Sequence, residues 1–172
     1  MVGKPRKYWL ICAPLLVAAA PADRVPLGIF SGWGAFRDAA PLRCYAIATP
    51  VRRSRGAWSS FASVAIWPRQ HINGQVHFRL REPRMRNSPI RLVFGDRSFP
   101  LVAASLDAWA PDARADAAII AAMRSSTSMR IAWVSKDGRD RSDGYLLKGL
   151  ATGIDAAALG CASSPSPAGG RG

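Results

Sequence analysis

Residues 61–67 read FASVAIW, a run whose apolar side chains fall on both faces of an extended chain. A strand that is apolar on both faces is typical of the interior of a sheet, where both faces are covered. The run therefore predicts a central strand. The segments before and after it in the sequence decide what kind of sheet it joins.

Two later segments, VHFRLR (76–81) and IRLVF (90–94), alternate between apolar and polar side chains. A period of two is that of a strand with one buried face and one solvated face. The dipeptide Asn73-Gly74 precedes the first segment. Both of its residues accept a positive φ, which favours a two-residue hairpin turn at that point.

The rest of the chain adds short strands and one clear helix. The sequence DARADAAIIAAMRS (112–125) has Asp112 in a good N-cap position, Asp116 early and Arg124 late, which agrees with the helix dipole. A shorter helical piece is expected at 154–159. Further strands are expected at 32–36, 43–48, 98–103, 129–136 and 145–150, with a turn at Asp137-Gly138. The expected fold is mainly β: a single antiparallel β-sandwich or partly closed barrel with one packed α-helix at about 112–125.

The first 22 residues read as a cleavable signal peptide. Lys4, Arg6 and Lys7 precede an apolar run at 10–20, and small residues at 20–22 predict cleavage near Ala22. The alternative is a membrane anchor, but the run is about half of the roughly 20 residues that cross a bilayer. The sequence thus predicts a periplasmic or extracellular, cell-surface protein with a β-rich domain at 23–162. A disordered tail, SSPSPAGGRG, follows at 163–172.

Cleavage of the leader removes Cys12 and leaves Cys44 and Cys161. Two cysteines in an exported protein favour a disulfide, which would tie the early strands to the C-terminal end. The alternative is a metal site made by both thiols with His71 and His77. Those four residues show no known ligand spacing, so no metal and no cofactor are expected.

Several landmarks resemble a known family in their order and spacing. They are Trp33, Cys44-Tyr45-Ala46, Phe99, Trp109, the helix segment IIAAMR (119–124), Met129, Tyr145-Leu146-Leu147, Gly149 and Cys161. This set, over residues 32–161, resembles the invasion-associated locus B (IalB) family of small exported bacterial proteins. The resemblance implies a periplasmic or surface-associated, β-rich protein with a cysteine pair and no cofactor.

No catalytic constellation stands out in the sequence. It contains no G-x-S-x-G elbow, and Glu82 is the only glutamate. The alternative of a hydrolase acting on the cell wall or on lipids depends on His71 and His77. If they pair across a hairpin, they would share a surface with Asp96 or Glu82. The expectation is therefore a non-enzymatic protein.

Arginine is the one suggestive feature. The chain carries a formal net charge of +13. If the strands at 76–81 and 90–94 are adjacent, Arg79, Arg81 and Arg91 lie on one outer face, where guanidinium groups would bind phosphates or carboxylates. The alternative is compositional, because the mature region has only two lysines, Lys136 and Lys148. The arginine face would then be a solvated edge that resists strand association.

For an exported protein, the expected anions are lipopolysaccharide and phospholipid head groups rather than nucleic acid. The predicted function is an envelope protein, peripheral to the membrane at most. It would bind such anionic components or support another envelope protein. A structural subunit of an envelope complex is a further alternative.

Overall fold

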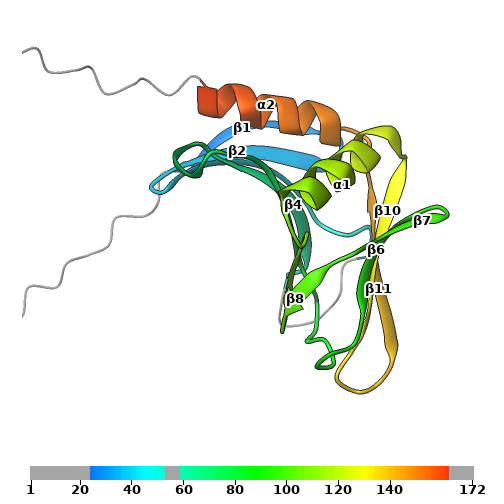
Figure 1. Cartoon of the computed structure of the whole chain (residues 1–172). Coiled ribbons are helices and arrows are strands. Elements are labelled where there is room, and N and C mark those ends of the chain that lie inside the picture. The colour runs from blue at the N-terminus through cyan, green and yellow to red at the C-terminus, as the bar shows by residue number, and fades with distance from the viewer. Residues whose placement is uncertain (1–23, 53–58, 163–172) are drawn as a thin grey trace, which may run out of the picture.

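The computed structural model describes residues 24–52 and 59–162, which form eleven strands, one 3-10 helix and two α-helices (Figure 1). The predicted leader (1–22), the predicted tail (163–172) and residues 53–58 lie outside the described residues. In chain order the elements are β1 (Arg24–Phe30), β2 (Trp33–Ala39), β3 (Leu42–Ala48), β4 (Phe61–Trp67), η1 (Pro68–Gln70), β5 (Ile72–Arg79), β6 (Ile90–Phe94), β7 (Arg97–Pro100), β8 (Val102–Ala104), β9 (Asp107–Trp109), α1 (Ala113–Ser125), β10 (Ser128–Val134), β11 (Asp140–Leu146) and α2 (Leu150–Ala162).

The strands form two antiparallel sheets. The large sheet has seven strands in the order β1-β2-β3-β4-β5-β9-β8, and the small sheet has four in the order β11-β10-β6-β7. This arrangement confirms the mainly β fold class, and its two separate sheets are those of the expected sandwich rather than of a partly closed barrel. The run at 61–67 is β4, the middle strand of the large sheet, as its apolar faces predict.

The core lies between the two sheets. Val76 and Phe78 of β5 and Leu80 just after it are fully buried, and the inward side chains of β6 belong to the same apolar cluster. Burial of each such side chain contributes about 1.5–3 kcal/mol relative to exposure. The Trp33 indole of β2 donates a hydrogen bond to the Leu146 carbonyl of β11 at 2.9 Å. This bond joins the large sheet to the small one.

Helix α1 begins where the sequence predicts. The Asp112 carboxylate accepts a hydrogen bond from the Ala115 N–H at 2.8 Å, which satisfies one of the free donors of the first turn. Asp116 accepts the Val76 N–H at 2.8 Å and so fastens the helix to β5. Burial raises the pKa of Asp116, and the Val76 N–H opposes that rise. The buried side of the helix consists of Asp116, Ile119, Ala122 and Met123.

Helix α2 is longer than the expected piece at 154–159, so the sandwich carries two packed helices of equal length. It lies over the strands at the β1 end of the large sheet (Figure 1). Gly149, just before the helix, allows this close packing, because its φ is 89° and a Cβ there would lie 2.0 Å from the Phe30 carbonyl oxygen of β1. The expected disulfide is present: Cys161 at the end of α2 bonds Cys44 of β3, with an S–S distance of 2.06 Å.

The hairpin expected at Asn73-Gly74 is wrong. Both residues lie inside β5, and the chain turns earlier through η1, after which His71 adopts a left-handed φ of 56°. Gly74 has a packing role instead, since a Cβ there would lie 2.7 Å from Ile120 of α1. The glycine leaves room for the helix on β5 rather than allowing a turn.

The strand expected at 98–103 is divided at Leu101. β7 pairs with β6 in the small sheet, whereas β8 pairs with β9 in the large sheet. The turn at Asp137-Gly138 is confirmed, with a φ of 77° at Gly138, but β11 follows at once and ends at Leu146. β1 and β9 match none of the expected strands.

Candidate anion-binding site

Arg79 projects from the outer face of the large sheet and is held by a carboxylate. Its Nη1 donates to both oxygens of Asp107, at 3.1 and 2.9 Å. The His77 Nε2 lies 2.9 Å from the same carboxylate, and the His77 ring stacks on Trp109 with centroids 5.2 Å apart. The Arg79 guanidinium is therefore part of a structural pair on this face.

Arg81 turns toward the interior. Its guanidinium bonds the carboxylate of Asp143, whose side chain is 1% exposed, and donates to the Ser142 carbonyl at 3.0 Å. It also lies 5.3 Å from the Trp133 ring centroid. Burial raises the pKa of Asp143 and the Arg81 charge opposes that rise. Since the Asp143 carboxylate is out of water, its counterion is Arg81.

Arg91 does not share a face with Arg79 and Arg81, so the predicted three-arginine face is wrong. β5 pairs with β4 and β9 in the large sheet, whereas β6 pairs with β10 and β7 in the small sheet. The connection at 80–89 crosses from one sheet to the other. Although β5 and β6 follow one another in the sequence, they are therefore not neighbours in a sheet.

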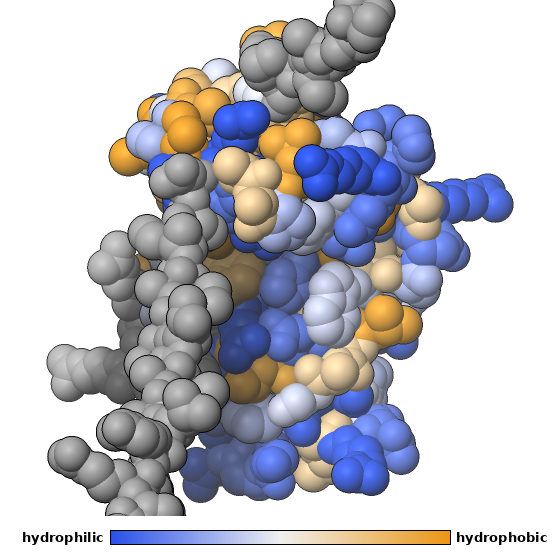
Figure 2. All heavy atoms as spheres, turned by 90° about the vertical axis from the view of Figure 1, so that its left-hand side faces the viewer, coloured by the Kyte–Doolittle hydropathy of each residue, from blue (hydrophilic) through white to orange (hydrophobic). Residues whose placement is uncertain are grey.

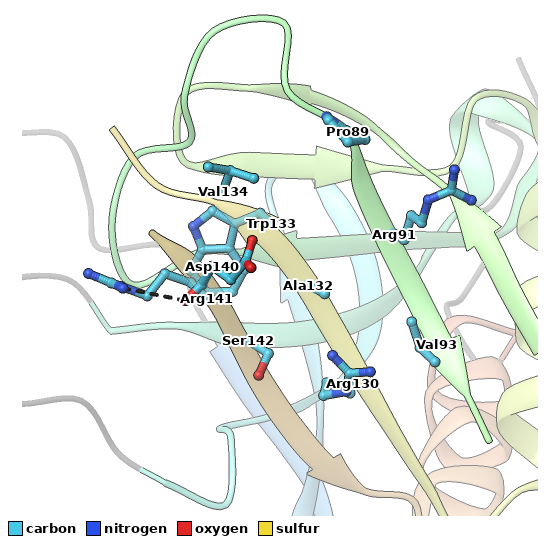
Figure 3. Close-up of a pocket in the computed structure, with 10 residues that line it drawn as sticks. All are labelled: Pro89, Arg91, Val93, Arg130, Ala132, Trp133, Val134, Asp140, Arg141 and Ser142. Atoms are coloured by element: carbon cyan, nitrogen blue, oxygen red, sulfur yellow. Dashed lines mark hydrogen bonds between the residues drawn. The ribbon is translucent and has the colours of Figure 1, made fainter. Parts of the chain in front are cut away.

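The arginine that does accompany Arg91 is Arg130 of β10. The register pairs Arg91 with Ala132 and Val93 with Arg130, so the two arginines occupy diagonal positions of adjacent strands. Diagonal neighbours lie about 7–8 Å apart. Both side chains project from the outer face of the small sheet (Figure 3). Within residues 24–52 and 59–162, neither guanidinium has a hydrogen-bond or ion-pair partner.

These two arginines line a groove with a volume of about 370 Å³, called here the arginine groove. Its floor is formed by short side chains of β6, β10 and β11: Val93, Ala132, Val134 and Ser142. Asp140 is the one acidic residue among the described residues that line it. The arginine groove therefore combines two available cations with a mostly apolar floor.

Arg141 closes one end of the arginine groove but is held by acids. Its Nε donates to Glu82 at 2.5 Å and its Nη2 to Asp137 at 2.9 Å. The hydrogen bond to Glu82 is the largest of the effects that raise the Arg141 pKa. Arg141 thus remains charged, but its charge is already neutralised by protein groups.

The two histidines of the hydrolase alternative are not brought together. His71 lies in the turn before β5, whereas His77 lies within β5, five residues beyond its first residue, a span of about 16 Å along the strand. The carboxylate beside His77 is Asp107, not Glu82 or Asp96 as expected. The Ser63 hydroxyl next to His77 bonds its backbone carbonyl at 3.4 Å rather than its ring.

His71 borders a different groove, between the start of β5 and α1. Its volume is about 740 Å³, and Asp112, Asp116 and Ile120 also line it. The two carboxylates are used by the backbone N–H groups of Ala115 and Val76. In the described part of the chain, no group of three or more His, Cys, Asp or Glu residues is placed to hold a metal ion.

Sequence reasoning missed Arg130, although a signal was present. In SMRIAWV (128–134), Met129, Ile131 and Trp133 alternate with Arg130, Ala132 and Val134. The alternation places Arg130 on the outer face. The pairing of β10 with β6, which brings Arg130 next to Arg91, is a contact between segments about 40 residues apart and has no local signal.

No protein-family model matches this sequence, and no curated protein or solved structure does either. Neither helix in the described ranges has both the length and the apolarity needed to cross a bilayer.

Proposed function

We propose that this chain is an exported, non-enzymatic envelope protein that binds an anionic component of the cell envelope through the arginine groove. The observation that carries the proposal is the pair Arg91 and Arg130 on one exposed face, with no carboxylate partner among the described residues. Two neighbouring guanidinium groups suit a phosphate, because each presents several donors in a plane.

The ion pairs of the fold distinguish structural arginines from available ones. The pairs are Arg24 and Arg43 with Asp38, Arg79 with Asp107, Arg81 with Asp143 and Glu82, Arg124 with Asp155, Arg139 with Asp137, and Arg141 with Glu82 and Asp137. Acidic residues are far fewer than basic ones in the sequence. Two arginines outside these ion pairs, Arg91 and Arg130, both line the arginine groove.

The predicted leader and the disulfide support a location outside the cytoplasm, because disulfides persist in oxidising compartments. The anions expected there carry phosphate groups, in lipopolysaccharide or in phospholipid head groups.

The test uses two probes. One is inorganic polyphosphate, a polyanion without lipid, and the other is aggregated lipopolysaccharide. Binding is measured by isothermal titration calorimetry and by co-sedimentation, at low and high NaCl. The double variant Arg91→Ala/Arg130→Ala is expected to weaken binding by at least about tenfold, since hydrogen bonds to charged groups contribute about 1.5–3 kcal/mol. High salt is expected to weaken binding as well.

The matched control is Arg69→Ala/Arg114→Ala. It removes the same charge from exposed arginines of η1 and α1, away from the arginine groove. If both double variants lose affinity equally, binding reflects net charge rather than a site. If polyphosphate and lipopolysaccharide do not bind the unmodified protein at all, the proposed function is wrong.

A further inference from the structure

The arginine groove continues into a second depression on the same face of the small sheet. This depression has a volume of about 390 Å³ and shares Val93 and Arg130 with the arginine groove. Its other lining residues include Val51, Gly144 and Leu146. Arg130 therefore stands between a cationic half and an apolar half of one continuous surface, called here the docking face.

Two large aliphatic side chains border the apolar half and are exposed. Val51 is 64% exposed and Leu146 is 63% exposed. The backbone N–H of Val51 donates to the Gly144 carbonyl at 2.9 Å, which fixes this segment beside β11. These aliphatic groups stabilise no core, and they lie beside an arginine that has no ion-pair partner among the described residues; exposed apolar groups in such a setting can mark an interaction site.

No helix or strand of the described residues covers the docking face. The helices cover the large sheet, with α2 on β1 to β4 and α1 on β5. The small sheet is at the right-hand side of Figure 1, and no element of the described residues lies beyond it. Its outer surface is therefore available to a large partner.

The absence of a side chain at Gly144 creates the apolar hollow next to Arg130. The register pairs Gly144 directly with Arg130, and a Cβ on Gly144 would meet only the Met129 carbonyl oxygen, at 4.0 Å. A larger residue would fit sterically. Glycine leaves a shallow depression at the foot of the arginine instead.

We infer that the docking face binds the surface of a lipid bilayer that contains anionic phospholipids. Val51 and Leu146 would enter the boundary between head groups and acyl chains, while Arg91 and Arg130 bind lipid phosphates. This inference rests on the proposed function, since it uses the same arginine groove. A soluble polyanion would use the cationic half alone, whereas a bilayer surface complements the charged and the aliphatic halves together.

The experiment compares a membrane with a lipid-free anion. Vesicles of phosphatidylcholine with phosphatidylglycerol, vesicles of phosphatidylcholine alone, and inorganic polyphosphate are titrated with the full chain. The double variant Val51→Ser/Leu146→Ser is expected to lower affinity for the anionic vesicles about tenfold, because two aliphatic groups are no longer removed from water. Its affinity for polyphosphate is expected to stay unchanged.

The matched control is Val25→Ser/Ile29→Ser, which removes two exposed aliphatic side chains from β1 at the far edge of the large sheet. It is expected to bind anionic vesicles like the unmodified protein. Circular dichroism melting checks that both double variants are folded. Residual vesicle binding in high salt is expected to disappear in Val51→Ser/Leu146→Ser, because only the apolar part of binding resists screening.

The outcomes separate the two proposals. Equal vesicle binding by Val51→Ser/Leu146→Ser and the unmodified protein overturns the bilayer inference, even where polyphosphate binding supports the arginine groove. Equal binding to neutral and anionic vesicles also overturns it. Loss of polyphosphate binding only in Arg91→Ala/Arg130→Ala, together with loss of vesicle binding in both variants, supports the two proposals. No binding to either probe overturns both.

Discussion

The outer faces of the two sheets both carry arginines, but they use them differently. On the large sheet, Asp38 pairs with Arg24 at 2.9 Å and with Arg43 at 2.6 Å. The Arg43 guanidinium also lies 4.6 Å from the Tyr45 ring centroid and 5.1 Å from that of Trp67. These contacts form a polar and aromatic layer over the strands, which buries Tyr45 on a nominally outer face.

On the small sheet, Arg91 and Arg130 have neither a carboxylate nor an aromatic ring among the described residues. Figure 2 shows the side of the molecule where the large sheet lies, and its described surface intersperses hydrophilic and hydrophobic residues. The comparison shows that an arginine count predicts little by itself. What distinguishes a binding arginine from a structural one is whether the fold supplies its counterion.

The largest effect on stability is expected from a variant that breaks the interior ion pair between Arg81 and Asp143. Arg81→Ala leaves the buried Asp143 carboxylate without its counterion, which we expect to lower the free energy of unfolding by about 3–5 kcal/mol. Urea unfolding at pH 7 measures it. The contrasting variant is Arg91→Ala, whose side chain has no ion-pair partner within residues 24–52 and 59–162. Equal losses in Arg81→Ala and Arg91→Ala would contradict the assignment of one as structural and the other as available.

Removal of the disulfide tests whether the large sheet depends on this bond more than the small sheet does. Cys44→Ser/Cys161→Ser is expected to lower stability by about 2–5 kcal/mol. Because the bond joins α2 to β3, hydrogen exchange should increase more in those two elements than in β10 and β11. A uniform increase across both sheets would show that the bond stabilises the whole sandwich rather than its large sheet.

The pH dependence of stability is expected to differ between the buried carboxylates of the two regions. Burial alone would raise the pKa of Asp38, but the hydrogen bonds from Arg24 and Arg43 outweigh it and lower that pKa. The stability that Asp38 contributes is thus present above the ordinary aspartate range, and it is lost as the pH falls below about 4. The stability difference between the unmodified protein and Asp38→Asn should shrink as the pH falls from 5 to 2.

Asp143 is expected to behave in the opposite sense, since burial raises its pKa. Its neutral form is favoured in the folded state, so the stability linked to it is lost as the pH rises through its folded pKa. Unfolding curves of Asp143→Asn between pH 3 and 7 provide the comparison. The expected result is that the pH dependences linked to Asp38 and Asp143 have opposite signs, whatever their size.

The smallest expected effect on stability is that of the binding arginines. Arg91→Ala/Arg130→Ala should change the free energy of unfolding by no more than about 0.5 kcal/mol, as is usual for exposed surface positions. Differential scanning calorimetry is the measurement. A loss of several kcal/mol would mean that the two arginines stabilise the small sheet, and it would remove the basis for the arginine groove as a binding site.

Local patterns predicted the parts of the fold that depend on neighbours in the sequence. The double-sided apolar run is β4, the alternating run at 90–94 is β6, and the capped helix begins after Asp112. Each depends on periodicity or on a cap within a few residues. The disulfide followed from the count of cysteines that remain after predicted leader cleavage.

The rest depends on contacts that no local pattern encodes. Asn73-Gly74 has the composition of a turn, yet Pro68 and the left-handed His71 turn the chain earlier, and Gly74 makes room for Ile120. The division at Leu101 sends consecutive strands to different sheets. The same kind of crossing at 80–89 separated Arg91 from its expected partners and left Arg130 as its true neighbour.

The bond from the Trp33 indole to the Leu146 carbonyl gives the docking face an optical reporter on its inner side. The Leu146 backbone accepts that bond, while its side chain is exposed on the outside. Ligand binding at the Leu146 side chain is therefore expected to change the environment of the Trp33 indole, which is bonded to the same residue. The difference in emission between the unmodified protein and Trp33→Phe would report ligand arrival without any added dye.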